Sequence, residues 1–143
     1  MPIHNYPFTP MGDVARPMLW VRLSAETGRK KTKPLLAKVD TGADACFFPA
    51  DVAIELGYEL RSVEPVMIES STGQGTAMPH TSIVDVLEML PDGSPGEIVL
   101  CHVARVPVYF VENGTSFLLG AKSFLDQFVL KVDYREQTFS LED

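Results

Sequence analysis

The chain has 143 residues and a net charge of −7, with 45% hydrophobic and 22% charged residues. This length suits one domain that buries a core of its own, and the composition is that of a globular protein rather than a disordered one. The excess of 19 acidic over 12 basic side chains argues against a protein that binds nucleic-acid backbones, which requires clustered lysine and arginine.

The first third of the chain reads as a lead-in segment followed by short strands and a helix. Residues 1–16 are rich in proline and show no periodicity, so we expect an N-terminal arm ahead of a single domain over 17–143. Apolar runs then predict strands, and the last of them leads into a helix that ends at Gly57. The predicted strands span 18–25, 35–39 and 46–49, with a charged turn at 26–33, and the helix spans 50–56.

The rest of the chain adds more short strands joined by strong turn signals. Small polar residues at 70–77 predict a hairpin tip, the segment 91–96 predicts a turn, and Asn113-Gly114 predicts another hairpin. Many short strands with few helices predict a mostly β domain, either a closed barrel or a sandwich. The predicted strands span 66–69, 81–90, 97–104, 107–111, 117–119, 128–132 and 138–141, with one or two helical turns over 121–127.

One segment joins a buried strand to a polar turn. The apolar run that ends at Val39 leads into Asp40, which is followed by Thr41, Gly42 and Ala43. A carboxylate directly after a buried strand is costly unless it is exposed, paired or neutralised. Gly42 permits a close approach that a Cβ would prevent. Taken alone, Asp-Thr-Gly is also typical of an Asx-type turn at a strand end.

The order of segments around this motif resembles that of the retropepsin-like aspartic proteases. In that family an Asp-Thr-Gly-Ala loop precedes a mobile flap hairpin, and an apolar-apolar-Gly segment leads into a helix near the C-terminus. This chain has the loop at 40–43, a glycine-bearing hairpin tip at 71–77 and Leu118-Leu119-Gly120. The resemblance covers residues 18–141. It implies a mostly β, closed barrel of short strands with a flap hairpin and one or two short helices.

The resemblance also implies a mechanism and roles for individual residues. In the family a water held between two aspartates attacks the peptide bond, while one carboxylate takes its proton and the other, protonated, polarises the carbonyl. Carried over to this chain, the catalytic loop is Asp40, Thr41 and Gly42. The implied substrate-binding residues border the cleft, line its apolar pockets or form the flap: Ala43, Asp44, Phe47, Phe48, Gly73, Gln74, Gly75, Leu118 and Leu119.

The number of motifs constrains the assembly. Asp-Thr-Gly occurs once in this chain, whereas two-domain relatives carry both copies in a much longer one. The second Asp40 must therefore come from a second copy, and we predict a homodimer with its active site on the two-fold axis. The other predicted partner is a peptide or protein substrate, bound as an extended strand between flap and cleft floor.

The chain departs from the family pattern after Gly120. Many relatives have an arginine at the next position that pairs with an acidic residue just after the motif; this chain has Ala121 and Lys122, with Asp44 at the acidic position. Lys122 can replace arginine only as a point charge. A second hypothesis is therefore a catalytically inactive retropepsin-like domain for peptide binding or dimerisation. A third is a β-barrel binding module with a chance Asp-Thr-Gly.

The cysteines and histidines suggest little chemistry of their own. Cys46 and Cys101 lie in apolar runs and read as buried thiols, and His4, His80 and His102 match no common metal-binding spacing. A nucleophilic pair, Cys101 with His80 or Cys46 with His102, stays open. We expect no cofactor, metal, nucleic acid or membrane partner. With two cysteines, no signal-peptide pattern and no long apolar run, we expect a cytoplasmic location.

Overall fold

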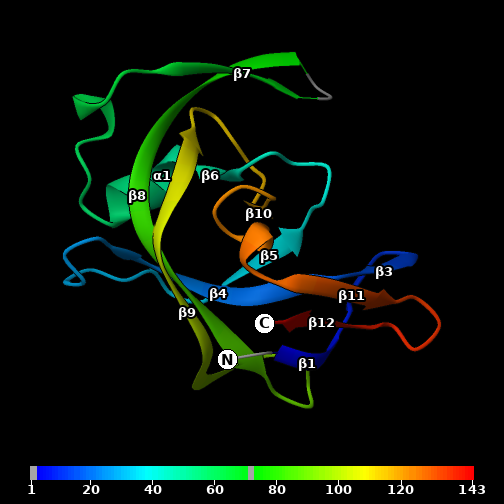
Figure 1. The fold of residues 1–143 in the computed structure, drawn as a ribbon. Coiled ribbons are helices and arrows are strands. Elements are labelled where there is room, and N and C mark those ends of the chain that lie inside the picture. Colours follow the sequence, from blue (N-terminus) through cyan, green and yellow to red (C-terminus); the bar gives the residue numbers. More distant parts are fainter. Residues whose placement is uncertain (1–2, 71–72) are drawn as a thin grey trace.

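The computed structural model describes residues 3–70 and 73–143. It confirms the predicted fold class, because 57% of the described residues are in strands, 9% are in helices, and the strands close into a barrel (Figure 1). Within these ranges no helix is long and apolar enough to cross a membrane.

The strands are β1 (Ile3–Pro7), β2 (Thr9–Met11), β3 (Val14–Arg16), β4 (Met18–Ala25), β5 (Leu35–Val39), β6 (Cys46–Pro49), β7 (Val66–Ser70), β8 (Gly73–Met89), β9 (Pro95–Val111), β10 (Leu118–Leu119), β11 (Val129–Asp133) and β12 (Thr138–Glu142). The helices are α1 (Ala50–Glu55) and the 3₁₀ turns η1 (Leu60–Ser62) and η2 (Leu125–Gln127).

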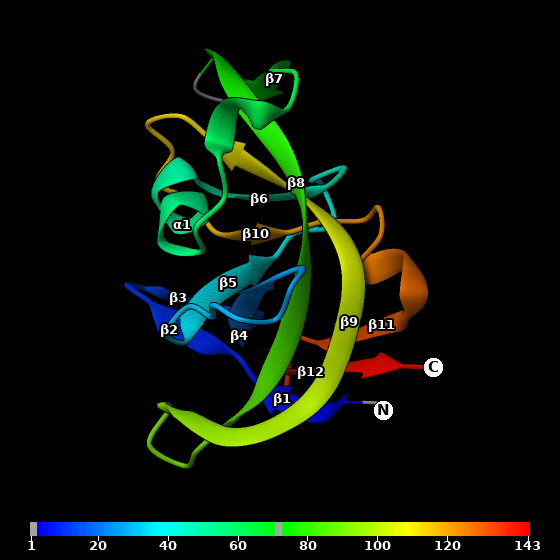
Figure 2. The ribbon, with the colours of Figure 1, turned by 90° about the vertical axis from the view of Figure 1, so that its left-hand side faces the viewer.

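The barrel in the described part of the chain contains six strands in the order β4-β5-β10-β6-β9-β8. It closes where β8 pairs back onto β4, with Val21 opposite Val86 and Ala25 opposite Ser82. Strand β7 lies outside this ring and pairs with β8. The β7–β8 hairpin therefore projects from one end of the barrel, at the top of Figure 1 and Figure 2.

The core is built from strands that bury one face. In β5 the side chains of Leu35 and Val39 are buried while Lys38 is half-exposed, which is the two-residue period of a strand. Phe48 of β6 is fully buried and stacks on Phe117, with ring centroids 5.6 Å apart. Truncating a buried aromatic side chain of this kind to alanine typically costs about 3–5 kcal/mol. The apolar runs that predicted strands in the sequence therefore contribute buried side chains to the core.

The N-terminal segment differs from the aperiodic arm that we expected. Strand β1 pairs antiparallel with β12, and the side chains of Ile3, Tyr6 and Phe8 are buried in the main core. The Tyr6 hydroxyl donates to the carbonyl of Leu87 at 2.9 Å and accepts from the Trp20 N–H at 3.1 Å. A register shift between Ile3 and Tyr6 breaks the alternation, and prolines obscured the rest. This is why the sequence pattern did not reveal the strand.

Two turn predictions also need correction. The strands expected at 97–104 and 107–111 are one strand, β9, and the apparent break is a bulge at Arg105, where φ is +58°. The hairpin predicted at Asn113-Gly114 is wrong. A turn forms there, with the Gly114 N–H donating to the Val111 carbonyl. The chain then enters β10, which pairs with β5 and β6 instead of returning along β9.

Candidate active site

Asp40 sits directly beyond the end of β5, in a turn held by backbone hydrogen bonds. Its N–H donates to the Leu119 carbonyl at 3.0 Å, and its carbonyl accepts from the Ala43 N–H at 3.2 Å. The carboxylate closes the turn as well, because Oδ1 accepts from the Gly42 N–H at 2.9 Å. These bonds fix the direction of the carboxylate.

Strand β10 holds this turn in place from its central position in the barrel. Leu119 lies beside Val39 of β5 and Leu118 beside Phe47 of β6. Immediately after β10, the Ala121 N–H donates to the Ala43 carbonyl at 2.9 Å. The apolar-apolar-Gly segment and the Asp-Thr-Gly loop are therefore neighbours in space although about 80 residues separate them in the sequence.

Asp40 forms an ion pair with Lys38, a residue of β5. The Lys38 Nζ lies 4.0 Å from Asp40 Oδ2, and the two side chains are 40% and 28% exposed. An ion pair this open to solvent typically contributes between 0 and about 1 kcal/mol. The pair therefore does little for stability, and its importance is that it places a cation beside the carboxylate.

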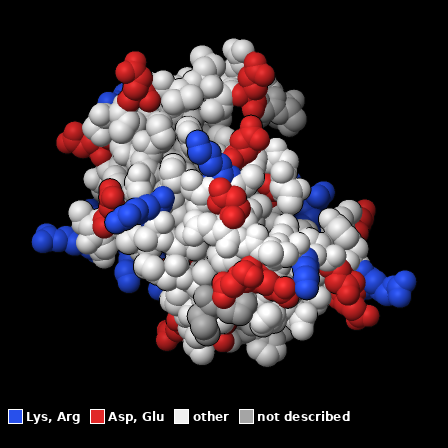
Figure 3. Space-filling view, viewed as in Figure 1, with Lys and Arg blue, Asp and Glu red and all other residues white. Residues whose placement is uncertain are grey.

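A cleft of about 830 Å³ opens between the Asp40 loop and the β7–β8 hairpin. Its volume falls in the range of sites that take a ligand. The lining includes four acidic residues, and within the described parts of the chain no lysine or arginine lines it. Over the whole face seen in Figure 3, charges of both signs are scattered. The acidic lining residues are Asp40, Asp44, Glu69 and Glu112.

Most of the residues singled out in the sequence meet at this cleft. Its floor and one wall come from the Asp40 loop and strands β6 and β10, and its other side comes from the start of β8. The predicted residues that line it are Asp40, Gly42, Ala43, Asp44, Phe47, Gln74, Gly75 and Leu118.

Four other predicted residues lie elsewhere. Phe48 and Leu119 are fully buried in the core, so the structure does not place them against a ligand in the cleft. Thr41 is exposed next to Asp40 and outside the cleft lining, and Gly73 begins β8 opposite Ser70. The residues between Ser70 and Gly73, which belong to the predicted flap tip, lie outside the described residues.

The sequence reasoning missed one wall of the cleft. Ile68, Glu69 and Thr76 of the hairpin and the segment 111–116 face the Asp40 loop. The turn at Asn113-Gly114 was the available signal, but we interpreted it as a hairpin tip. Because β10 crosses to the middle of the sheet, the segment that precedes it must pass along the cleft.

The cysteine–histidine pairs considered above are not assembled. The Cys46 thiol is buried, and desolvation raises its pKa from 9.0 to about 11. Burial likewise raises the pKa of Cys101. His80 Nε2 lies 3.0 Å from the Leu60 carbonyl, and His102 Nδ1 donates to Asp85 at 2.6 Å. Thiols with raised pKa values are poor nucleophiles.

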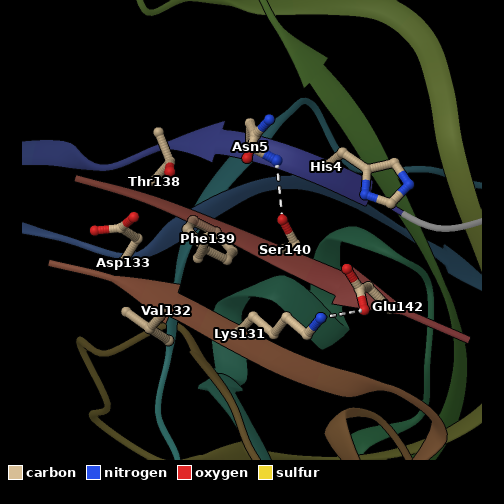
Figure 4. Close-up of a pocket in the computed structure, with 9 residues that line it drawn as sticks. All are labelled: His4, Asn5, Lys131, Val132, Asp133, Thr138, Phe139, Ser140 and Glu142. Atoms are coloured by element: carbon tan, nitrogen blue, oxygen red, sulfur yellow. Dashed lines mark hydrogen bonds and ion pairs between the residues drawn. The ribbon is translucent and has the colours of Figure 1, made fainter. Parts of the chain in front are cut away.

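A second, smaller cavity of about 280 Å³ lies on the β1-β12-β11 sheet, away from the Asp40 loop (Figure 4). Four of the polar residues that line it are engaged with each other in two pairs. Lys131 Nζ lies 3.1 Å from Glu142, and the Asn5 N–H donates to Ser140 Oγ at 3.0 Å. We assign no chemistry to it.

The position after Gly120 also departs from the family pattern in the structure. The Lys122 N–H donates to the Asp44 carbonyl at 2.8 Å, so the two backbones are adjacent. In the described part of the chain, however, no ion pair joins the Lys122 ammonium to the Asp44 carboxylate. Lysine does not take over the role of the arginine within one chain.

No family model and no curated protein matches this sequence. The structure is similar to the crystal structure of a retropepsin-like aspartic protease from Rickettsia conorii, with a TM-score of 0.58 and 18% sequence identity. The match covers 90% of this chain and 86% of that chain. The fold of this protein is therefore retropepsin-like. At this identity the comparison establishes the fold alone.

Proposed function

We propose that this protein is an aspartic endopeptidase that acts as a homodimer. The observation that carries the proposal is the position of Asp40, on the floor of a cleft of about 830 Å³ that lies beneath a β-hairpin. An extended peptide fits between floor and hairpin, bound partly through its main chain as an added strand. Phe47 and Leu118 supply apolar contacts on the floor.

The proposed chemistry needs two carboxylates that share one proton. With Asp40 of each copy on the two-fold axis, the ionised carboxylate takes a proton from a water, and the oxygen of that water bonds to the scissile carbonyl carbon. The protonated carboxylate gives its proton to the carbonyl oxygen. The resulting diol collapses, the C–N bond breaks, and the amine leaves with a proton from the dyad. Asp40 Oδ1 already accepts from Gly42, which supports a fixed carboxylate orientation.

The test compares Asp40→Asn with the parent on a peptide library read by mass spectrometry. We expect cleavage to fall by at least about 100-fold while the thermal unfolding midpoint stays close to that of the parent. The matched control is Asp51→Asn, which changes an exposed carboxylate on α1 and should cleave normally. Equal cleavage by parent and Asp40→Asn would exclude the mechanism.

A second candidate is a catalytically inactive retropepsin-like domain that binds peptides or dimerises. It is favoured by the missing ion pair between Asp44 and Lys122. Sedimentation and peptide binding separate the two candidates: an inactive domain binds peptides without cleaving them.

A cytoplasmic location is part of the proposal, supported by the two free, buried cysteines, Cys46 and Cys101.

A further inference from the structure

The segment between β1 and β4 forms a small hairpin that stands apart from the other sheets. Strands β2 and β3 pair with each other around Gly12, where φ is +67°, and in the described chain they make up a separate two-stranded sheet. An isolated hairpin of two strands is marginal in water. A hairpin of this size is therefore stabilised by what it packs against.

The two faces of this hairpin differ in their surroundings. Pro10 and Ala15 are opposite each other in register, and Ala15 packs against the main core. Met11 and Val14 form the next pair, and because side chains alternate along a strand they point to the opposite face. Met11 is 48% exposed and Val14 is 52% exposed. An apolar pair thus projects from the body of the protein.

The base of the hairpin is attached to the end of β5, one residue before Asp40. Pro17 directly follows β3, and its carbonyl accepts from the N–H of Val39, the residue before Asp40, at 3.0 Å. In Figure 1 the hairpin projects on the right, the side on which β5 ends. The hairpin is therefore rooted where the proposed dyad needs a second copy.

Phe8, which directly precedes β2, attaches the N-terminal end of the hairpin to the turn between β11 and β12. The Phe8 N–H donates to the Gln137 carbonyl at 2.9 Å. The Phe8 ring packs edge-on against the Tyr134 ring, with the two ring centroids 5.5 Å apart. Tyr134 is itself 72% exposed, and the turn between β11 and β12 projects on the same side in Figure 1. A partner that reaches the hairpin from this side also meets an exposed aromatic ring.

We propose that residues 9–16 form a dimer arm, whose Met11 and Val14 face packs against a second copy of this chain. The inference rests on the proposed function, because the dyad is incomplete without that copy. In a two-fold dimer each chain contributes one arm, so every apolar contact is made twice. The arm thereby couples assembly of the dimer to the position of the Asp40 loop.

The test places charges on the exposed face with the double variant Met11→Asp/Val14→Asp. Sedimentation velocity over a range of concentrations should show the dimer dissociation constant rise by at least about tenfold. Peptidase activity per chain should fall at low concentration and recover at high concentration. The control is Ile54→Asp on α1, a site that is 62% exposed; its dimerisation should equal that of the parent.

Hydrogen exchange of the parent gives a second readout that needs no variant. Backbone amides of residues 9–16 should become more protected as concentration rises through the dissociation constant. Three results would each contradict the proposed dimer arm. They are a parent protein that stays monomeric, an unchanged dissociation constant in the double variant, and hydrogen exchange in residues 9–16 that does not depend on concentration. If these measurements support the dimer arm but Asp40→Asn still cleaves peptides, the proposed function is refuted and the dimer arm is not.

Discussion

Gly120 lies directly against the backbone of Ala45. A Cβ on Gly120 would stand 2.1 Å from the Ala45 carbonyl oxygen and 2.7 Å from that of Ala43. Real Cβ atoms do not approach backbone this closely, so the contact requires glycine. Through this contact the segment after β10 determines how the chain leaves the Asp40 loop.

Replacing Gly120 with alanine should therefore destabilise the protein and displace the Asp40 loop. We expect the free energy of unfolding to fall by about 1–3 kcal/mol, as measured by urea denaturation. The control is Gly75→Ala, where a Cβ meets its nearest neighbours at 3.8 and 3.9 Å, and a change within about 0.5 kcal/mol is expected. Equal stability of the two variants would contradict the packing argument.

The buried thiol of Cys46 should make stability fall at alkaline pH. Well below pH 9 the thiol is neutral in both states. Between about 9.0 and about 11 the unfolded chain ionises while the folded thiol, whose pKa is raised by burial, keeps its proton. Stability therefore decreases as pH rises. We expect a loss of about 2 kcal/mol from this group between about pH 8 and pH 10.5.

Urea unfolding of the parent and of Cys46→Ala at both pH values measures this effect. Tyr6, whose burial raises its pKa to about 12, titrates in both proteins and cancels in the comparison. The variant should lose less stability than the parent on going to high pH. The same loss in both proteins would show that Cys46 is not the group responsible.

His102 should stabilise the fold through its hydrogen bond to the Asp85 carboxylate. Asp85 is 8% exposed, and its Oδ1 accepts from His102 Nδ1 at 2.6 Å. In His102→Ala a mostly buried carboxylate loses this donor, which we expect to cost about 1–3 kcal/mol. A double-mutant cycle with Asp85→Asn measures the coupling. A coupling energy near zero would mean that solvent satisfies Asp85 as well as His102 does.

Introducing the family's arginine should be tolerated at position 121. The Ala121 N–H donates to the Ala43 carbonyl, beside Asp44, so an arginine side chain there can reach the Asp44 carboxylate. We expect Ala121→Arg to raise the free energy of unfolding by at most about 1 kcal/mol. Ala121→Glu, which adds a like charge, should lower it. Identical stabilities for the two variants would show that no ion pair forms.

The acidic lining of the cleft should favour basic substrates. Asp44 and Glu69 lie in a cleft that, among the described residues, is lined by no lysine or arginine, and complementary charge promotes encounter and specificity. If the protein cleaves peptides, we expect faster cleavage when lysine or arginine flanks the scissile bond. Glu69→Gln should reduce this preference, and raising the salt concentration should weaken it. A preference for acidic peptides would contradict the prediction.

Local pattern was sufficient for several elements because their apolar residues follow one face. Strands β4, β5 and β6 have the bounds that the sequence predicted, and α1 ends one residue earlier, ahead of Gly57. The pattern failed where an irregularity interrupts it. The register shift in β1 and the bulge at Arg105 in β9 each displace side chains by one position, which removes the alternation that the prediction depends on.

The site could be predicted only in part for a related reason. Residues near Asp40 in sequence, such as Ala43 and Phe47, line the cleft as expected. Sequence alone could not separate Leu118 from Leu119, since both are apolar. Their neighbours in the sheet decide that Leu118 faces the cleft and Leu119 is buried in the core.

The sequence by itself determined that this chain is a mostly β domain with one Asp-Thr-Gly loop. That follows because apolar alternation and turn residues are local properties. Only the tertiary structure decided that β10 inserts between β5 and β6, that the segment 111–116 walls the cleft, and that β1 joins the core. These features depend on pairing between distant segments, which no local pattern encodes.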